Sequence, residues 1–384
     1  MAGASKQRVV ILGAGTGGTL VANRLRHRMN PERVRIDVID QNDAHLYQPG
    51  LLFVPFGMAA ADDVVRSRSD HLVDGVYYHQ RPIERVDVQT NTVTLTDGGM
   101  LDYDALVIAS GSTLHPEYTT GLTGSGWMRD VFTFFDLPGA TALAKRLEHF
   151  DRGRLVINLL DLPVKSPVAP IEFAILAHRW FEERGVRDQI RLTYATPLTM
   201  GDQPLGPPPL EEALADARVE SVTAFHTREV DGERRRLISY EGQEIQFDLA
   251  VVVPVHGGEE YIGRSPALGD AFGYVPTDHR TLQSKIQPNV FCIGDAADLD
   301  HVRGGSVTAY EAEVLVENVV ALLRAREPDA SFDGSTNCFI EASLRTWGSE
   351  QDNDHHHGTL GTVADPAMKL EFQDAYWNSL LQPV

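Results

Sequence analysis

The chain has 384 residues, 42% of them hydrophobic, and a formal charge of −20 at pH 7. This length suits two folding units, and this composition suits a globular protein with a substantial core. The negative charge would repel phosphate backbones and no basic stripe offsets it, so nucleic acid is excluded as a partner. No apolar run reaches the roughly 20 residues that span a bilayer. The N-terminus enters a strand without a signal peptide, so we expect a cytoplasmic protein.

The first 40 residues predict one βαβ unit, with a strand at residues 9–12, a helix at 19–29 and a strand at 34–40. The turn between strand and helix has the sequence Gly13-Ala14-Gly15-Thr16-Gly17-Gly18, which fits the dinucleotide-binding pattern. In that pattern Gly13 permits the tight turn, Gly15 lets a pyrophosphate approach, and Gly18 allows close helix packing. Asp40 ends the second strand, where an acid can accept a hydrogen bond from an adenosine ribose. We predict an ADP-containing cofactor, with FAD and NAD both open at this point.

Further strands indicate a second unit of the same kind. Alternating stretches at residues 83–88 and 92–95 predict a small antiparallel insert before a strand at 105–109. A second αβ series follows, with strands at residues 155–160, 190–194 and 249–253. A strand at 290–293 and a helix at about 307–324 predict a return to the first unit.

The predicted fold class is therefore α/β, with two tandem Rossmann-like dinucleotide-binding domains and a short C-terminal region. The first domain is discontinuous in this prediction. We place its two parts at residues 1–113 and 285–327, the second domain at 114–284, and the C-terminal region at 328–384.

Two later segments resemble the flavoprotein disulfide-reductase superfamily. Residues 103–111 (YDALVIASG) are similar to the strand that closes over the adenine side of FAD, and residues 289–297 (NVFCIGDAA) to the second FAD motif. In that motif an Asp at the position of Asp295 binds the ribityl chain. The resemblance implies FAD as the cofactor. Members that use NADH carry a second glycine fingerprint, but residues 161–170 (DLPVKSPVAP) contain no glycine, so we expect a different electron donor.

Residues 42–52 (NDAHLYQPGLL) resemble sulfide:quinone oxidoreductases and the flavin subunit of sulfide dehydrogenases. In that family the Gln-Pro pair, here Gln48 and Pro49, lies near the isoalloxazine ring. The resemblance to these flavoproteins implies the following cofactor-binding residues: Gly13, Gly15, Thr16, Gly17, Gly18, Asp40, Gln48, Pro49, Ile83, Ser110, Gly111, Gly294, Asp295 and Thr308.

The same family has two reactive cysteines beside the flavin, where sulfide attacks their disulfide. The matching segments here are Lys165-Ser166-Pro167-Val168-Ala169-Pro170 and Asn337-Cys338-Phe339-Ile340-Glu341. The resemblance implies a catalytic set of Lys165, Ser166 and Cys338, with serine in place of one cysteine. Because serine cannot form a disulfide, the usual cycle of two thiols cannot run. Either Ser166 is an introduced substitution or the native protein has drifted to another reaction.

We therefore predict an FAD-dependent oxidoreductase that passes electrons from sulfide or a related sulfur species to a quinone or another acceptor. The acceptor is open because Val307-Thr308-Ala309 replaces the Lys-Thr-Gly of quinone-reducing relatives. An NADH:acceptor flavin reductase and a non-catalytic flavoprotein subunit are the alternatives. We expect a homo-oligomer.

The C-terminal residues Phe372, Tyr376 and Leu380 share one helical face, which suits either an interfacial or dimer-contact helix or a helix packed on its own domain. A weak peripheral contact with the inner membrane surface is therefore an alternative to a free cytoplasmic protein. Cys292 lies in an apolar run and is expected in the core. No metal is expected, since the adjacent histidines at 355–357 point in different directions. His45, His178 and His256 are interpreted as surface or hydrogen-bonded histidines.

Overall fold

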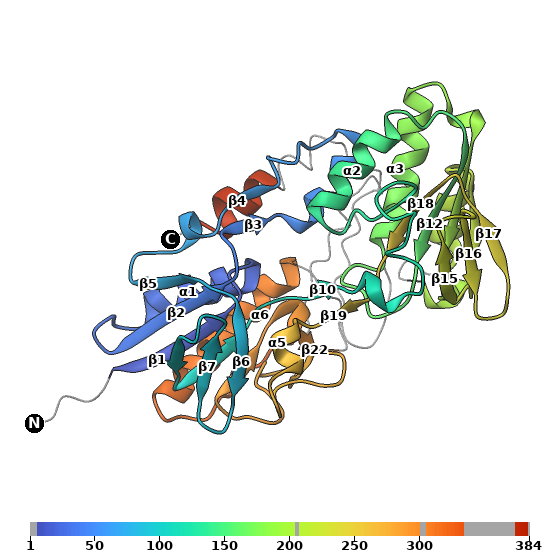
Figure 1. The fold of residues 1–384 in the computed structure, drawn as a ribbon. Coiled ribbons are helices and arrows are strands. Elements are labelled where there is room, and N and C mark those ends of the chain that lie inside the picture. The colour runs from blue at the N-terminus through green and yellow to red at the C-terminus, as the bar shows by residue number, and fades with distance from the viewer. Residues whose placement is uncertain (1–5, 204–206, 300–304, 334–372, 383–384) are drawn as a thin grey trace, which may run out of the picture.

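The computed structural model describes residues 6–203, 207–299, 305–333 and 373–382. It contains two five-stranded parallel sheets, each with helices packed on it and each extended by a small antiparallel sheet. The first sheet occupies the lower left of Figure 1 and the second its upper right.

The first sheet has the strand order β21-β9-β1-β2-β5. Its inner strands β1 and β9, and the short strand β21, are apolar runs whose residues are almost all buried, whereas the edge strand β5 is half-exposed. Helices α1 and α6 pack side by side, and Arg24 of α1 donates a hydrogen bond of 2.8 Å to the carbonyl oxygen of Ala309 in α6. The elements are β1 (Gln7–Leu12), α1 (Thr16–Arg28), β2 (Val34–Asp40), β5 (Val76–Gln80), β9 (Ala105–Ile108), β21 (Val290–Cys292) and α6 (Gly305–Leu323).

Shorter elements surround this sheet. An antiparallel sheet consists of β6 (Ile83–Asp87), β7 (Thr92–Leu95) and β8 (Met100–Asp102), as the alternating sequence predicts. Two-stranded pairs are β3 (Ala44–Leu46) with β4 (Val65–Ser67), and β20 (Val275–Pro276) with β22 (Ala297–Asp298). The 3₁₀ turns are η1 (Gln48–Leu52), η2 (Val54–Phe56), η3 (Ser69–His71) and η7 (Gly294–Ala296).

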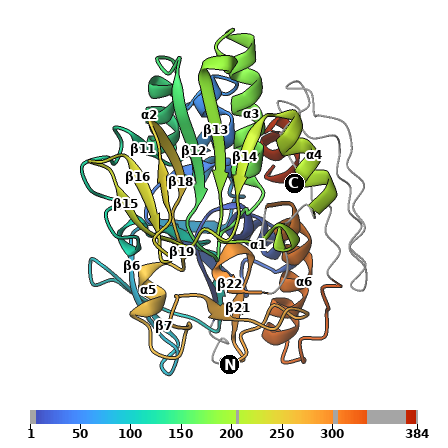
Figure 2. The same ribbon diagram turned by 90° about the vertical axis from the view of Figure 1, so that its right-hand side faces the viewer.

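The second sheet has the order β11-β18-β12-β13-β14 and faces the viewer in Figure 2. It consists of β11 (Val131–Phe132), β12 (Gly153–Leu159), β13 (Ile190–Ala195), β14 (Val219–Val222) and β18 (Leu249–Val253). Its helices are α2 (Leu137–Leu147), α3 (Ala169–Glu183) and α4 (Pro207–Asp216). The antiparallel extension is β15 (Thr227–Asp231), β16 (Arg236–Ser239) and β17 (Glu244–Gln246). The 3₁₀ turns η4 (Pro116–Tyr118), η5 (Arg187–Gln189) and η6 (Met200–Asp202) complete the unit.

The two units are joined by an antiparallel pair, β10 (Thr113–Leu114) and β19 (His256–Gly257). Residues 260–265 make contacts with the first unit. Helix α5 (Glu260–Gly263) packs on β6, and Ser265 accepts a hydrogen bond of 2.7 Å from the backbone amide of Val86. The segment between Glu260 and Ser284 lacks a long periodic element, so its placement depends on tertiary contacts.

The C-terminal segment, residues 373–382, packs on its own chain beside β3 and β4 (Figure 1). Tyr376, Trp377 and Leu381 are buried there. For these side chains the segment is therefore packed on its own domain and is not an interfacial or dimer-contact helix. Cys292 is fully buried in the core, as expected. Among the described residues, no helix is long and apolar enough to cross a membrane, and no cluster of His, Cys, Asp and Glu is arranged to hold a metal ion.

Candidate functional site

The glycine turn between β1 and α1 has the geometry of a phosphate-binding turn. Gly13 has a φ of +101°, which favours glycine, and a Cβ atom on Gly18 would lie 1.8 Å from the carbonyl oxygen of Gly13. A Cβ on Gly15 would instead meet nothing closer than the Arg68 guanidinium at 4.0 Å. The turn is therefore closed where helix and strand pack and open beside Gly15, which fits the approach of a pyrophosphate to the start of α1.

Asp40 lies directly against this turn. Its Oδ2 atom accepts a hydrogen bond of 2.8 Å from the backbone amide of Ala14 and lies 3.0 Å from Nη1 of Arg68. Arg68, in the loop between β4 and η3, was missed by the sequence analysis because nothing local marks it. Its Nε atom is buried and has no hydrogen-bond partner among the described residues. A cation facing Gly15 with an unused donor suits an anionic ligand.

The end of β9 forms a second wall of the turn. A Cβ on Gly13 would lie 2.4 Å from the carbonyl oxygen of Ala109, so the two segments are in close contact. Ser110 shares a hydrogen bond of 2.9 Å with the hydroxyl of Tyr261, and Gly111 has a φ of +70°. Burial raises the pKa of Tyr261, so its hydroxyl stays protonated at physiological pH.

The η7 turn and the start of α6 also lie against the glycine turn. A Cβ on Gly17 would lie 3.1 Å from methyl carbons of both Ile293 and Thr308. Gly294 has a φ of +66°, and its backbone amide donates a hydrogen bond of 3.0 Å to Glu311. The sequence analysis missed Glu311, which lies one helical turn beyond Thr308. Its contact with Gly294 forms only when α6 packs against the η7 turn. The predicted residues at 17, 294 and 308 thus lie together.

Gln48 and Lys165 bring the two units into contact. The ammonium of Lys165 donates a hydrogen bond of 2.8 Å to Oε1 of Gln48, and it lies 5.8 Å from the centre of the Phe135 ring. Burial lowers the pKa of Lys165, and the nearby carboxylates of Asp295 and Asp136 partly offset this effect. Gln48, Lys165 and Asp295 come from three distant segments, and the fold gathers them in one region.

Ser166 is half-buried in the loop between β12 and α3. This loop carries a cis peptide bond between Leu162 and Pro163 in place of a glycine turn. Cys338, which the resemblance pairs with Ser166, lies outside the described residues, as do the three histidines at 355–357.

Glu172 is a further candidate in this region. It lies in the first turn of α3, six residues after Ser166, and only 4% of it is exposed. An acid in the first helical turn is stabilised by the helix dipole, and buried carboxylates are uncommon unless they have a task or a partner. The sequence contained a signal for Glu172, since it is a lone acid within an apolar helix face.

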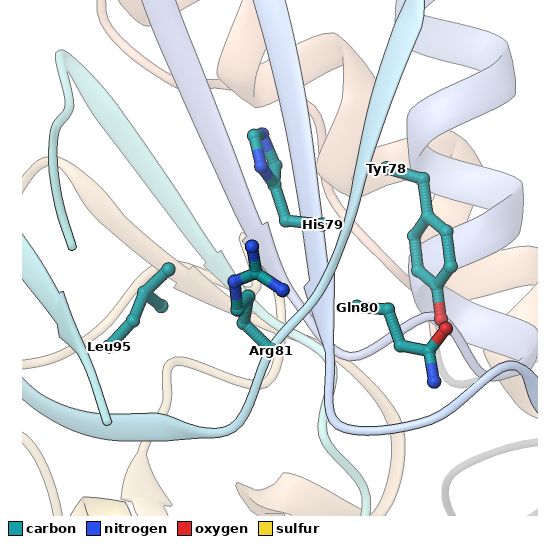
Figure 3. Close-up of a pocket in the computed structure, with 5 residues that line it drawn as sticks. All are labelled: Tyr78, His79, Gln80, Arg81 and Leu95. Carbon is teal, nitrogen blue, oxygen red and sulfur yellow. The ribbon is translucent and has the colours of Figure 1, made fainter. Parts of the chain in front are cut away.

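Ile83 and a neighbouring pocket lie beside β5, the edge strand of the first sheet. Ile83 begins β6, and its carbonyl oxygen accepts a hydrogen bond from Arg264. A pocket of about 480 Å³ lies beside β5. Figure 3 shows its lining residues, which are Tyr78, His79, Gln80, Arg81 and Leu95. Burial, and then the charge of Asp40, raises the pKa of Tyr78 to about 12. The pocket therefore borders the acid that ends β2.

Comparisons with known proteins agree with this geometry. Residues 7–157 match the family described as pyridine nucleotide-disulphide oxidoreductase. The mitochondrial sulfide:quinone oxidoreductase of Mus musculus is 26% identical over 86% of this chain and 74% of its own length. The mitochondrial sulfide:quinone oxidoreductase of Dictyostelium discoideum is 24% identical over 98% of this chain and 86% of its own length.

A solved structure extends the comparison to the fold. The sulfide:quinone oxidoreductase of Aquifex aeolicus superposes with a TM-score of 0.82 at 18% identity, covering 98% of this chain and 91% of that one. The predicted fold class, the predicted resemblance and the prediction of an oxidoreductase are confirmed, and a flavin cofactor is implied.

Proposed function

We propose that this sulfide:quinone oxidoreductase-like flavoprotein binds FAD along the first sheet and passes electrons from sulfide, or a related sulfur species, to a quinone or similar acceptor. The observation that carries this proposal is the hydrogen bond of 2.8 Å between Lys165 and Gln48. It joins the loop that contains Ser166 to the Gln-Pro pair that the family resemblance sets beside the flavin ring. Sulfur chemistry and flavin would therefore meet at the contact between the two units.

The residues around the glycine turn fit FAD. Gly15 and the start of α1 would hold the pyrophosphate, with Arg68 supplying positive charge, and Asp40 would face the adenosine ribose. Asp295 and Thr308 would lie along the ribityl and ring end, since η7 and the start of α6 border Gly17. When bound, the flavin supplies the ability to take up two electrons and pass them on.

The side chains near Ser166 suit an anionic sulfur substrate. Hydrosulfide carries a negative charge, and the Lys165 ammonium is the cation of this loop. When a quinone oxidises sulfide, two electrons pass from sulfur to the quinone, which becomes the quinol. The sulfur is then zero-valent and leaves bound to a thiol or another sulfur acceptor. The serine hydroxyl cannot carry that sulfur as a persulfide. In this chain the thiol that accepts the sulfur would therefore be Cys338 or an external thiol.

The second unit is unsuited to NADH. Its loop after β12 has no glycine beside which a pyrophosphate could lie. In addition, the buried carboxyl group of Glu172 lies in the first turn of α3, where the phosphates of NADH would bind. These features support an electron donor other than NADH.

The test is to load the protein with FAD and mix it with NADH or with sulfide. We expect about one FAD per chain and no bleaching of the flavin by NADH on the time scale of seconds. Rapid bleaching by NADH would contradict the proposal and favour an NADH:acceptor reductase. Absence of stoichiometric FAD would contradict the cofactor assignment itself.

A further inference from the structure

The C-terminal segment is fixed on the first unit by contacts with β4 and with the turn that precedes it. Gln373 donates a hydrogen bond of 2.7 Å to the carbonyl oxygen of Asp63. Arg66, in β4, lies with its guanidinium 4.9 Å from the centre of the Trp377 ring and donates a hydrogen bond of 3.3 Å to Asn378. We call residues 373–382 the C-terminal strap.

Aromatic packing anchors the strap. Trp377 is 1% exposed and stacks on the His71 ring, with ring centres 5.3 Å apart and an angle of 14°. The Trp377 and His45 rings meet edge to face, with ring centres 5.4 Å apart. The Tyr376 ring packs on the Tyr47 ring, with ring centres 4.8 Å apart. A strap held in this way is part of the folded unit, since a buried tryptophan is costly to expose.

The Tyr376 hydroxyl connects two segments of the site. It lies 2.6 Å from Oγ1 of Thr16 and 2.8 Å from Nε2 of His45. Thr16 is the first residue of α1, in the phosphate-binding turn. His45 lies on β3, three residues before Gln48. A phenol hydroxyl can donate one hydrogen bond and accept another, so Tyr376 can serve both partners at once.

The protonation state of His45 suits this role. His45 is 1% exposed, and burial, with the nearby Arg68 cation, lowers its pKa to about 3. The ring is therefore neutral at physiological pH, and a neutral imidazole can either accept from or donate to a hydroxyl.

We propose that Tyr376 is a positioning residue for the cofactor, through which the C-terminal strap ties the phosphate-binding turn to the loop that carries Gln48. This inference rests on the proposed binding of FAD. The two segments that Tyr376 joins are those assigned to the pyrophosphate and to the flavin ring, so docking of the strap pre-organises both ends of the site. Pre-organisation strengthens binding because less freedom is lost when the ligand binds. By reciprocity, FAD must stabilise the docked strap to the same extent.

The test compares FAD release from Tyr376→Phe, Thr16→Val and the double variant. Phenylalanine keeps the ring packing and removes only the hydroxyl, and valine is close in shape to threonine. The matched control is Ser379→Ala, in the exposed part of the strap. FAD release is followed by the rise in flavin fluorescence after dilution, and thermal unfolding of each apoprotein is measured in parallel.

We expect Tyr376→Phe to release FAD about tenfold faster than wild type, because two hydrogen bonds are lost together. The control should match wild type, and the double variant should be no faster than the faster single variant, since both changes break the same link. Equal release from Tyr376→Phe and wild type would overturn the inference, as would effects that multiply in the double variant. Wild-type protein that binds no FAD would instead overturn the proposed function.

Hydrogen exchange gives a second measurement that needs no variant. Backbone amides of residues 373–382 should exchange more slowly when FAD is added to the wild-type protein. Unchanged exchange in a protein that has bound FAD stoichiometrically would also overturn the inference.

Discussion

The Nζ atom of Lys165 lies 2.8 Å from the Oε1 atom of Gln48, although 117 positions separate them in the sequence. Lys165 belongs to the second unit and Gln48 to the first, so this contact closes the region where the two units meet. Any chemistry assigned to Ser166 is thereby brought beside the segment assigned to the flavin ring.

Gly15→Val should abolish FAD binding without unfolding the protein. The backbone of Gly15 is extended, with φ −78° and ψ −163°, so valine can adopt it, and its side chain would point into the open space assigned to the pyrophosphate. Bound FAD after reconstitution and the thermal unfolding midpoint are the two measurements. Gly263→Ala, at an exposed glycine with open space around it, should keep its FAD. A Gly15→Val protein with a full complement of FAD would show that the turn is misassigned.

Arg68→Met should weaken FAD binding by about tenfold, because the charge-assisted contact to phosphate is lost while the apolar stem is kept. Added salt should weaken FAD binding by the wild-type protein, so the difference in affinity between wild type and Arg68→Met should become smaller. Arg81→Met is the control, since Arg81 is an exposed arginine paired with Asp97 at 2.7 Å, on the pocket side of β5. Isothermal titration of the apoproteins with FAD gives the dissociation constants. Equal loss in both variants would argue against a specific role for Arg68.

His45 should make folding stability sensitive to mild acid. Its folded-state pKa of about 3 lies below the ordinary value of 6.5, so between these values the unfolded chain binds more protons than the folded one. Stability contributed by neutral His45 is therefore present above pH 6.5 and is lost as pH falls toward 3. From pH 7 to pH 5 the expected loss is about 2 kcal/mol.

Urea unfolding of wild type and His45→Gln at pH 7 and pH 5 measures this effect. The variant should lose about 2 kcal/mol less than wild type over that interval. His149→Gln, at an exposed histidine, should behave like wild type. A variant that loses as much stability as wild type would show that His45 is protonated in the folded protein.

Much of the fold was predictable because its strands are local apolar runs. The strand at residues 249–253 was predicted with its observed bounds, and α1 begins at Thr16 rather than Thr19 only because tertiary packing overrides the low helix propensity of Gly17 and Gly18. The glycine turn was recognisable for the same reason, since its function depends on the spacing of neighbouring residues.

The parts that were missed depend on contacts between distant segments. Arg68 faces Asp40 across a loop, and Tyr376 reaches Thr16 over 360 positions, so no pattern in their own neighbourhoods could reveal them. The contact of Val86 with Ser265 is likewise a tertiary hydrogen bond between distant segments. Such pairs become visible only when the sheets have assembled.

The most direct measurement is the rate at which sulfide bleaches the flavin of Ser166→Cys, compared with wild type, Ser166→Ala and the variant Ser166→Cys with Cys338→Ser. A second thiol would restore a disulfide that sulfide can attack, so we expect Ser166→Cys to be reduced faster than the other three by on the order of 100-fold. A quinone analogue should then reoxidise it. If wild type and Ser166→Cys are reduced by sulfide at the same rate, the position of Ser166 has no part in sulfur chemistry and the central proposal is wrong.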